Sequence, residues 1–241
     1  MGGGLVLLFI SVYYVCQSPK KVHLSFDDVA LDSSSDFEDF VEDLKIYNSL
    51  YGAKFSLYTF DVPENIVCND KLSKTSGWLK FSYHGSSQPF DTVAARTHYL
   101  KTLSHQLDLL RKMAGDSCLT KTVRLHYYYG DSAMLKEASL NGLTAFLSAD
   151  APGRLSYHLD SCKSASLYNS GTLIDDSKKF YRTDVRLEQT TLWNCIANDN
   201  LSDTTLVIFT HKNKFGRYAK IKLHALMLFL WLNNYEFVID L

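Results

Sequence analysis

The stretch Leu24-Ser25-Phe26-Asp27-Asp28-Val29 has the pattern of an apolar strand that ends in two adjacent carboxylates. Neighbouring carboxylates at a strand end repel each other, and a cation or a proton relieves that repulsion. The polar run 32–36 follows closely, so a solvated surface turn would also explain the pair. Later strand ends carry His, Arg or Asp as well, and this coincidence favours a functional site.

Length and composition indicate one globular domain. The chain has 241 residues, of which 46% are hydrophobic, enough for a single α/β barrel or two small domains, and one domain is the simpler interpretation. The formal charge is -1 and Lys and Arg are scattered without a basic stripe, so we expect no nucleic-acid partner. The five cysteines are widely spaced and form no CxxC pair, which fits reduced structural thiols.

Residues 1–20 are predicted to be an N-terminal extension of a domain that spans 21–241. The apolar run 5–15 has no Lys or Arg before it and no clear cleavage site after it, and it is shorter than the roughly 20 residues that cross a bilayer. We therefore expect no stable membrane insertion. A degenerate signal peptide and a buried or disordered extension both stay open, with a cytoplasmic protein favoured over an exported one.

Strand and helix patterns alternate along the chain, which predicts a parallel sheet, open or closed into a barrel. The predicted strands are 21–26, 53–60, 79–83, 122–128, 143–147, 205–209 and 237–239. The predicted helices are 37–50, 92–113, 131–140 and 217–232. Asp36 is the expected N-cap of the first helix, and Gly52 and Gly115 are expected to end the first two. Segments 154–158 and 179–182 break the alternation and predict an inserted hairpin.

Polar side chains lie where the predicted strands end. Carboxyl-end loops of such sheets converge on one face, so these side chains are candidates for one site. They are Asp27, Asp28, His84, Arg124, His126, Asp150 and His211. Arg124 and His126 are two residues apart and are expected on the same face of their strand. Each residue also has a plain structural explanation, and Asp150 is typical of a turn.

Four motifs, in order along the chain, resemble those of the polysaccharide deacetylase family, metal-dependent carbohydrate esterases on a distorted (β/α) barrel. The motifs are Ser25-Phe26-Asp27-Asp28, His84-Gly85, Arg124-Leu125-His126-Tyr127 and Phe209-Thr210-His211. The resemblance spans about residues 22–241. It implies an α/β fold, a single distorted barrel, and a hydrolase that deacetylates an N- or O-acetylated sugar. It also implies a divalent metal cofactor, with zinc as the expected ion.

The resemblance also implies a role for each motif residue. Asp27 would be the general base, Arg124 the group that orients it, and His211 the general acid. Asp28 and His84 would be metal ligands. Tyr127, next to the Arg motif, is a candidate substrate contact because its ring could serve as a platform.

Two positions depart from the family pattern. The family's second motif has a further His four positions after the first, where this chain has Gln88. The Arg motif usually has Pro two positions after the Arg, where this chain has His126. We expect His126 to replace the missing ligand, which restores an aspartate and two histidines around a zinc-like ion. A structure in which His126 pointed away from Asp28 and His84 would contradict this.

Two other functions stay open. One is a noncatalytic carbohydrate-binding relative in which Gln88 marks a decayed metal site. The other is glycoside hydrolase-type chemistry, in which Asp27 or Asp28 pairs with Asp150 at a separation of roughly 5 to 9.5 Å. A carbohydrate is the expected partner in all three cases.

Overall fold

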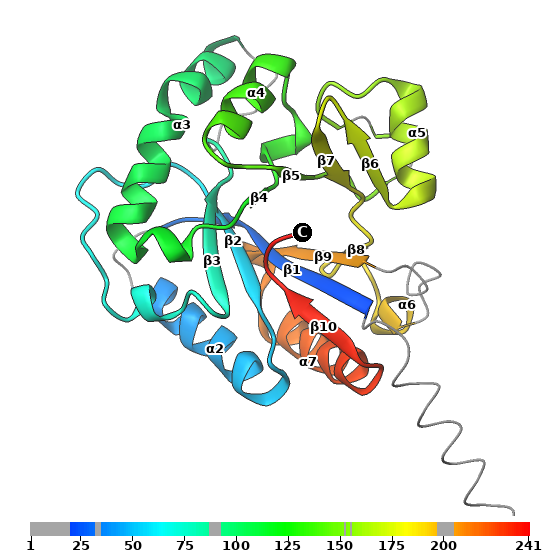
Figure 1. Ribbon diagram of the computed structural model, residues 1–241. Coiled ribbons are helices and arrows are strands. Elements are labelled where there is room, and N and C mark those ends of the chain that lie inside the picture. The colour runs from blue at the N-terminus through cyan, green and yellow to red at the C-terminus, as the bar shows by residue number, and fades with distance from the viewer. Residues whose placement is uncertain (1–19, 32–34, 87–92, 152, 155, 197–204) are drawn as a thin grey trace, which may run out of the picture.

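Two sheets with helices outside them form a distorted (β/α) barrel in the computed structural model, as predicted (Figure 1). The structure describes residues 20–31, 35–86, 93–151, 153–154, 156–196 and 205–241. The larger sheet has the order β3-β2-β1-β9-β8, and the smaller has the order β4-β5-β7-β6. The bounds in the larger sheet are β1 Lys20–Val29, β2 Phe55–Thr59, β3 Leu79–Tyr83, β8 Val185–Arg186 and β9 Thr205–His211. Those in the smaller sheet are β4 Thr122–Val123, β5 Ala145–Leu147, β6 Thr172–Asp175 and β7 Lys178–Tyr181.

The two sheets meet along β3 and β4. An isolated bridge pairs Phe81 with Leu119, and the His126 backbone N–H donates to the His84 carbonyl at 3.0 Å. On the other side the chain runs directly from β7 into β8, and the Asp184 backbone N–H donates to the Val207 carbonyl at 2.9 Å. Among the strands that the structure describes, every pairing except β6 with β7 is parallel. The carboxyl ends of the parallel strands therefore share one end of the barrel.

Alternation along β1 decides which of its side chains enter the barrel, because successive strand residues point to opposite faces. Phe26 faces outward, where its ring packs edge-on against Phe40 and Phe215. On the opposite face His23 contacts the Tyr58 hydroxyl at 3.1 Å, and Asp27 reaches Arg124 at 3.0 Å. The interior of the barrel is thus polar along this strand, and β1 delivers Asp27 to it.

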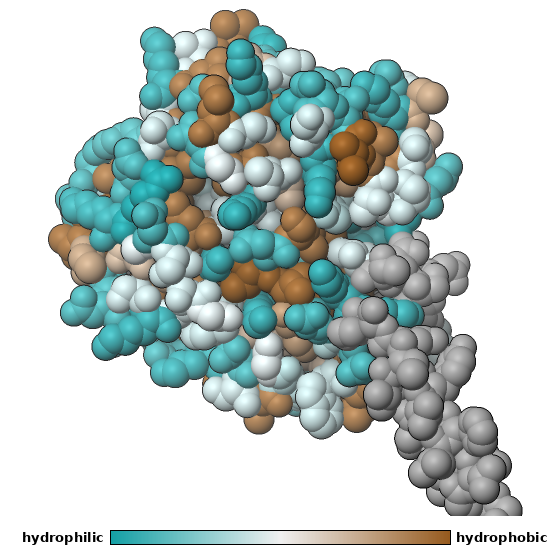
Figure 2. All heavy atoms as spheres, viewed as in Figure 1, coloured by the Kyte–Doolittle hydropathy of each residue, from teal (hydrophilic) through white to brown (hydrophobic). Residues whose placement is uncertain are grey.

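The helices cover the outside of the barrel (Figure 1). They are α2 Ser35–Tyr51, α3 Val93–Ala114, α4 Ser132–Leu140, α5 Ser161–Ser170, α6 Leu192–Ile196 and α7 Arg217–Leu232. Gly52 and Gly115 follow α2 and α3 with φ of +66° and +87°, which confirms both predicted helix ends. Hydrophilic residues cover much of the surface in Figure 2, with apolar atoms between them. Within the described residues, no helix is both long and apolar enough to span a bilayer.

The C-terminal segment links the two sheets. Strand β10, Tyr235–Val238, pairs in parallel with the first half of β1 in the larger sheet. Beyond it, Asp240 accepts hydrogen bonds from the Thr120 hydroxyl and the Lys121 backbone N–H, both at 2.7 Å, just before β4 of the smaller sheet. Lys80 forms an ion pair with the same carboxylate at 3.0 Å. We call Asp240 with these three partners the C-terminal clasp.

The predicted strand 122–128 is wrong after its first two residues. β4 ends at Val123, and His126–Tyr128 form a 3-10 turn in which Tyr127 and Tyr128 have φ of +57° and +58°. Left-handed backbone cannot continue a strand. The predicted N-cap is also wrong: Asp36 lies inside the first turn of α2, where its carboxylate pairs with Lys212 at 2.6 Å.

The predicted hairpin exists, but with a different first strand. β6 pairs antiparallel with β7, and the hairpin joins the smaller sheet because β7 pairs with β5. The described residues of segment 154–158, namely 154 and 156–158, form no strand. Tyr157 has φ of +58°, and its hydroxyl donates to the Leu147 carbonyl at 2.6 Å. The intervening helix α5 and the two-residue strand β8 were not predicted. Residues 5–15 and Gln88 lie outside the described residues.

Candidate active site

A cleft of about 220 Å³ lies at the carboxyl ends of the strands and collects the predicted site residues. The side chains that line it are Asp27, Asp28, His84, Arg124, Leu125, His126, Tyr127, Tyr128, Arg154, Arg186 and His211. They come from the ends of β1, β3 and β9, from the turn after β4, and from β8 and the loop after β5. Asp150 is not among the lining residues; it lies 3.9 Å from an Arg186 nitrogen.

A buried ion pair forms the floor of the cleft. Arg124 Nη1 lies 3.0 Å from Asp27 Oδ1, and the two side chains are 1% and 3% exposed. The same guanidinium donates to the hydroxyls of Ser25 and Thr183 at 3.1 and 3.0 Å, and it stacks 4.1 Å from the centre of the Phe209 ring. Burial alone would lower the pKa of Arg124, but the Asp27 carboxylate, together with the surrounding tyrosines, outweighs burial and the pKa rises. Arg124 therefore stays charged and fixes Asp27 in one orientation.

Three potential metal ligands converge beside this pair. Asp28 Oδ1 lies 3.5 Å from His84 Nε2 and 4.0 Å from His126 Nε2, and the three ligand atoms are all within 4.8 Å of one another. His126 therefore lies beside Asp28 and His84, as the sequence predicts. The Nδ1 of His84 hydrogen-bonds the Arg124 carbonyl, which only accepts, so Nδ1 carries the proton and Nε2 is left as an acceptor.

The backbone at Asp28 explains how adjacent carboxylates reach different neighbours. Asp28 has φ of +56°, and the pairing of β1 with β2 shifts register between Phe26 and Val29. A left-handed residue turns the chain out of strand geometry, so Asp27 points to Arg124 while Asp28 points to the histidines. Burial of Asp28 raises the pKa of its carboxyl, but the imidazoles of His84, His211 and His126 lower it by more.

The donor set fits a divalent cation. Asp28 Oδ1 is buried and accepts no hydrogen bond from the residues that the structure describes. A buried carboxylate oxygen without a donor is costly, and a bound cation would remove that cost. One carboxylate oxygen and two imidazole nitrogens are ligands that zinc and similar ions accept, and such a set leaves coordination positions open.

His211 is held by a residue that the sequence did not reveal. Its Nδ1 lies 2.6 Å from Glu188 Oε1, and its Nε2 faces Asp28 Oδ2 at 3.8 Å. Glu188 also accepts from Arg186 at 2.6 Å and from Thr210 at 2.8 Å. Burial would raise the pKa of Glu188, but these hydrogen bonds lower it to about 2. Burial would lower the pKa of His211, but the hydrogen bond that its Nδ1–H donates to Glu188 and the charges of Asp27 and Asp28 raise it overall.

Tyr127 lies at the rim of the cleft. The residue is 55% exposed, and its ring centre is 4.3 Å from that of His126. The neighbouring Tyr128, by contrast, is buried. An exposed ring beside the histidine cluster is well placed to contact a bound molecule.

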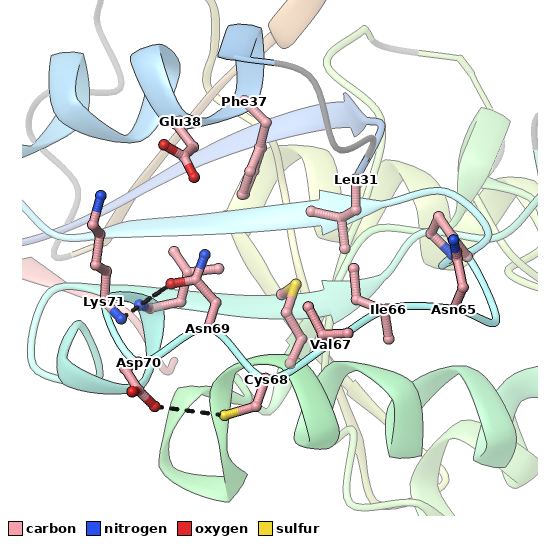
Figure 3. Close-up of a pocket in the computed structure, with 13 residues that line it drawn as sticks. Leu31, Phe37, Glu38, Asn65, Ile66, Val67, Cys68, Asn69, Asp70 and Lys71 are labelled. Carbon is pink, nitrogen blue, oxygen red and sulfur yellow. Dashed lines mark hydrogen bonds between the residues drawn. The ribbon is translucent and has the colours of Figure 1, made fainter.

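A larger groove of about 620 Å³ lies on the flank of the barrel (Figure 3). Phe37 of α2 faces Ile66 and Val67 of the loop after β2, and Cys68 lies 3.9 Å from Asp70. The described residues of its lining include no histidine and no buried ion pair. Because chemistry depends on convergent titratable groups more than on volume, the smaller cleft is the candidate active site.

The fold is similar to that of solved carbohydrate-active enzymes, although no protein-family model and no curated protein matches this sequence. A family 4 carbohydrate esterase from Streptomyces lividans matches with a TM-score of 0.54 at 11% identity, over 91% of this chain and 92% of that one. A family 4 acetyl xylan esterase from Clostridium thermocellum, solved with a cobalt ion, matches with 0.53 at 14% identity, over 91% and 88%. A 4-alpha-glucanotransferase from Thermococcus litoralis matches with 0.57 at 13% identity, over 92% of this chain and 39% of that one. At these identities the matches show a shared barrel fold.

Proposed function

We propose that this chain is a divergent polysaccharide deacetylase, a divalent-metal-dependent hydrolase that removes an acetyl group from an N- or O-acetylated carbohydrate. The observation that carries the proposal is one cleft that holds three functional units together. These are the Asp27–Arg124 ion pair, the Asp28, His84 and His126 cluster, and the His211–Glu188 pair. The fold shared with family 4 carbohydrate esterases supports it.

Asp28, His84 and His126 are the proposed metal ligands. A divalent ion in this cluster would act as a Lewis acid that polarises the acetyl carbonyl and lowers the pKa of a bound water. The His84 Nδ1–H that bonds the Arg124 carbonyl keeps the other ring nitrogen available as a ligand. His126 would replace the second histidine ligand of the family motif, whose position in this chain is Gln88.

Asp27 is the proposed general base. Its carboxylate, held by Arg124, would take the proton of the attacking water. His211 is the proposed general acid, and its raised pKa extends the protonated form to higher pH. His211 would donate its own ring proton to the departing sugar amine or hydroxyl. Tyr127 would contact the sugar ring from the rim of the cleft.

Metal content is the first test. We expect about one zinc, cobalt or manganese ion per chain after loading, by elemental analysis, because the site has a complete three-ligand set. The ion should be lost in each of three variants: Asp28→Asn, His84→Ala and His126→Ala. The control is His98→Ala, which should keep the ion because His98 pairs with Asp61 outside the cleft. The loaded protein should release acetate from acetylated glycans, and Asp27→Asn should abolish the release while the metal stays bound.

Two results would contradict the proposal. A wild-type protein that takes up none of these ions would remove the metal centre. A loaded protein that binds glycans but releases no acetate would instead indicate the noncatalytic carbohydrate-binding relative.

A further inference from the structure

The candidate cleft contains one charge that the proposed reaction does not use. Arg154 lines the cleft, its side chain is exposed, and it forms no ion pair with any residue that the structure describes. The other charges of the lining are accounted for. Arg124 pairs with Asp27, Arg186 pairs with Glu188 at 2.6 Å, and Asp28 lies among histidines.

The Arg154 guanidinium rests on an aromatic platform. Its Cζ lies 4.7 Å from the centre of the Tyr128 ring, within the range of a cation–π contact. Tyr128 is itself buried, and its carbonyl accepts a hydrogen bond from the Tyr157 backbone N–H at 2.7 Å. A cation–π contact does not require the N–H donors of the guanidinium, and arginine binds carboxylate and phosphate groups through these donors.

We propose that Arg154 forms a subsite for an anionic substituent of the sugar, a carboxylate or a phosphate. The inference rests on the proposed function to the extent that an acetylated sugar occupies the cleft. It names the substrate class more closely: an acetylated sugar that also carries a carboxylate or a phosphate. Neutral acetylated sugars would bind without this contact.

Three small probes test the subsite by direct binding, with no turnover required. N-acetylglucosamine is neutral, N-acetylmuramic acid adds a carboxylate to the same sugar, and N-acetylglucosamine 6-phosphate adds a phosphate. We expect the wild-type chain to bind at least one anionic probe about tenfold more tightly than the neutral one in a calorimetric or NMR titration, a difference of about 1.4 kcal/mol. Which anionic probe binds better distinguishes the carboxylate from the phosphate.

Variants assign the preference to the residue. Arg154→Leu should abolish the preference, and Arg154→Lys, which keeps the charge without the planar fork, should restore part of it. Arg96→Leu is the matched control, because Arg96 also stacks on a tyrosine, with its Cζ 5.7 Å from the Tyr129 ring centre, but does not line the cleft. Thermal melting of each variant would verify that the fold is intact.

Equal affinity for all three probes, no measurable binding of any of them, or a preference that survives Arg154→Leu would overturn the subsite. Failure of the proposed function gives a different result: an Arg154-dependent preference for anionic sugars in a protein that releases no acetate.

Discussion

Arg124 is the residue whose loss should most affect both stability and function. It is buried with Asp27, and removing one member of a buried ion pair leaves an uncompensated charge, which typically costs about 3–5 kcal/mol. We expect Arg124→Leu to lower the free energy of unfolding by about that amount in a urea titration. The double variant Asp27→Asn with Arg124→Leu removes both charges and should recover part of the loss. Equal stability of the single variant and the wild type would show that water reaches the pair.

Glu188 should set the pH range over which His211 remains a proton donor. The pKa of His211 is raised, so its protonated form is present at low pH and is lost as the pH rises through that pKa. Glu188→Gln removes the carboxylate that hydrogen-bonds Nδ1, and the pKa should fall. The alkaline limb of acetate release should then move to lower pH, and an NMR titration of the His211 ring should move with it. An unchanged limb would assign the general acid to another group.

At the level of elements, the sequence predicts best where the periodic pattern is long. The helix 217–232 and the strand 79–83 were predicted with the bounds that the structure has, and 92–113 differs by one residue at each end. The ends of β1, β3 and β9 were located well enough to identify most of the cleft. These segments were predicted well because a hydrophobic repeat can be recognised only when it extends over several helical turns or several strand residues.

Short elements escaped prediction for the same reason. β8 has two residues and β4 has two, too few to show any alternation. Glu188 follows β8 in a stretch without pattern, and its role comes from His211, which lies 23 positions away in sequence. The 3-10 turn at His126 depends on a backbone bond to His84. Such features arise from contacts between distant segments, so local sequence carries no signal for them.

The N-cap of α4 offers a test at this scale. Asp131 precedes the helix, and its carboxylate accepts a hydrogen bond from the Met134 backbone N–H at 2.9 Å. We expect Asp131→Ala to destabilise the protein by about 1 kcal/mol and Asp131→Asn to cost much less, measured by chemical unfolding. If both variants lose the same free energy of unfolding, the charge of Asp131 near Arg96 contributes more to stability than its hydrogen bond to Met134.

At the scale of the whole molecule, the C-terminal clasp should make stability depend on pH in the acid range. Burial raises the pKa of Asp240, but the hydrogen bonds from the Lys121 N–H and Thr120, and the charge of Lys80, lower it overall. Because the pKa of Asp240 is lower in the folded than in the unfolded protein, where it is about 3.9, ionised Asp240 stabilises the fold at pH values above about 3.9. This stabilisation is lost as the pH falls through the pKa of the folded protein. Asp240→Asn should therefore be less stable than the wild type at pH 7, and the gap should narrow below about pH 4. A gap that is independent of pH would mean that the hydrogen bonds alone, and not the ionised form, hold the two sheets together.

The left-handed backbone at Asp28 has a consequence for how this protein can evolve. Asparagine and glycine tolerate such a conformation better than other residues, and each is reached from an aspartate codon by a single base change. Both exchanges remove the carboxylate while leaving the backbone unstrained. One base change at this position can therefore remove a proposed metal ligand while the barrel stays folded.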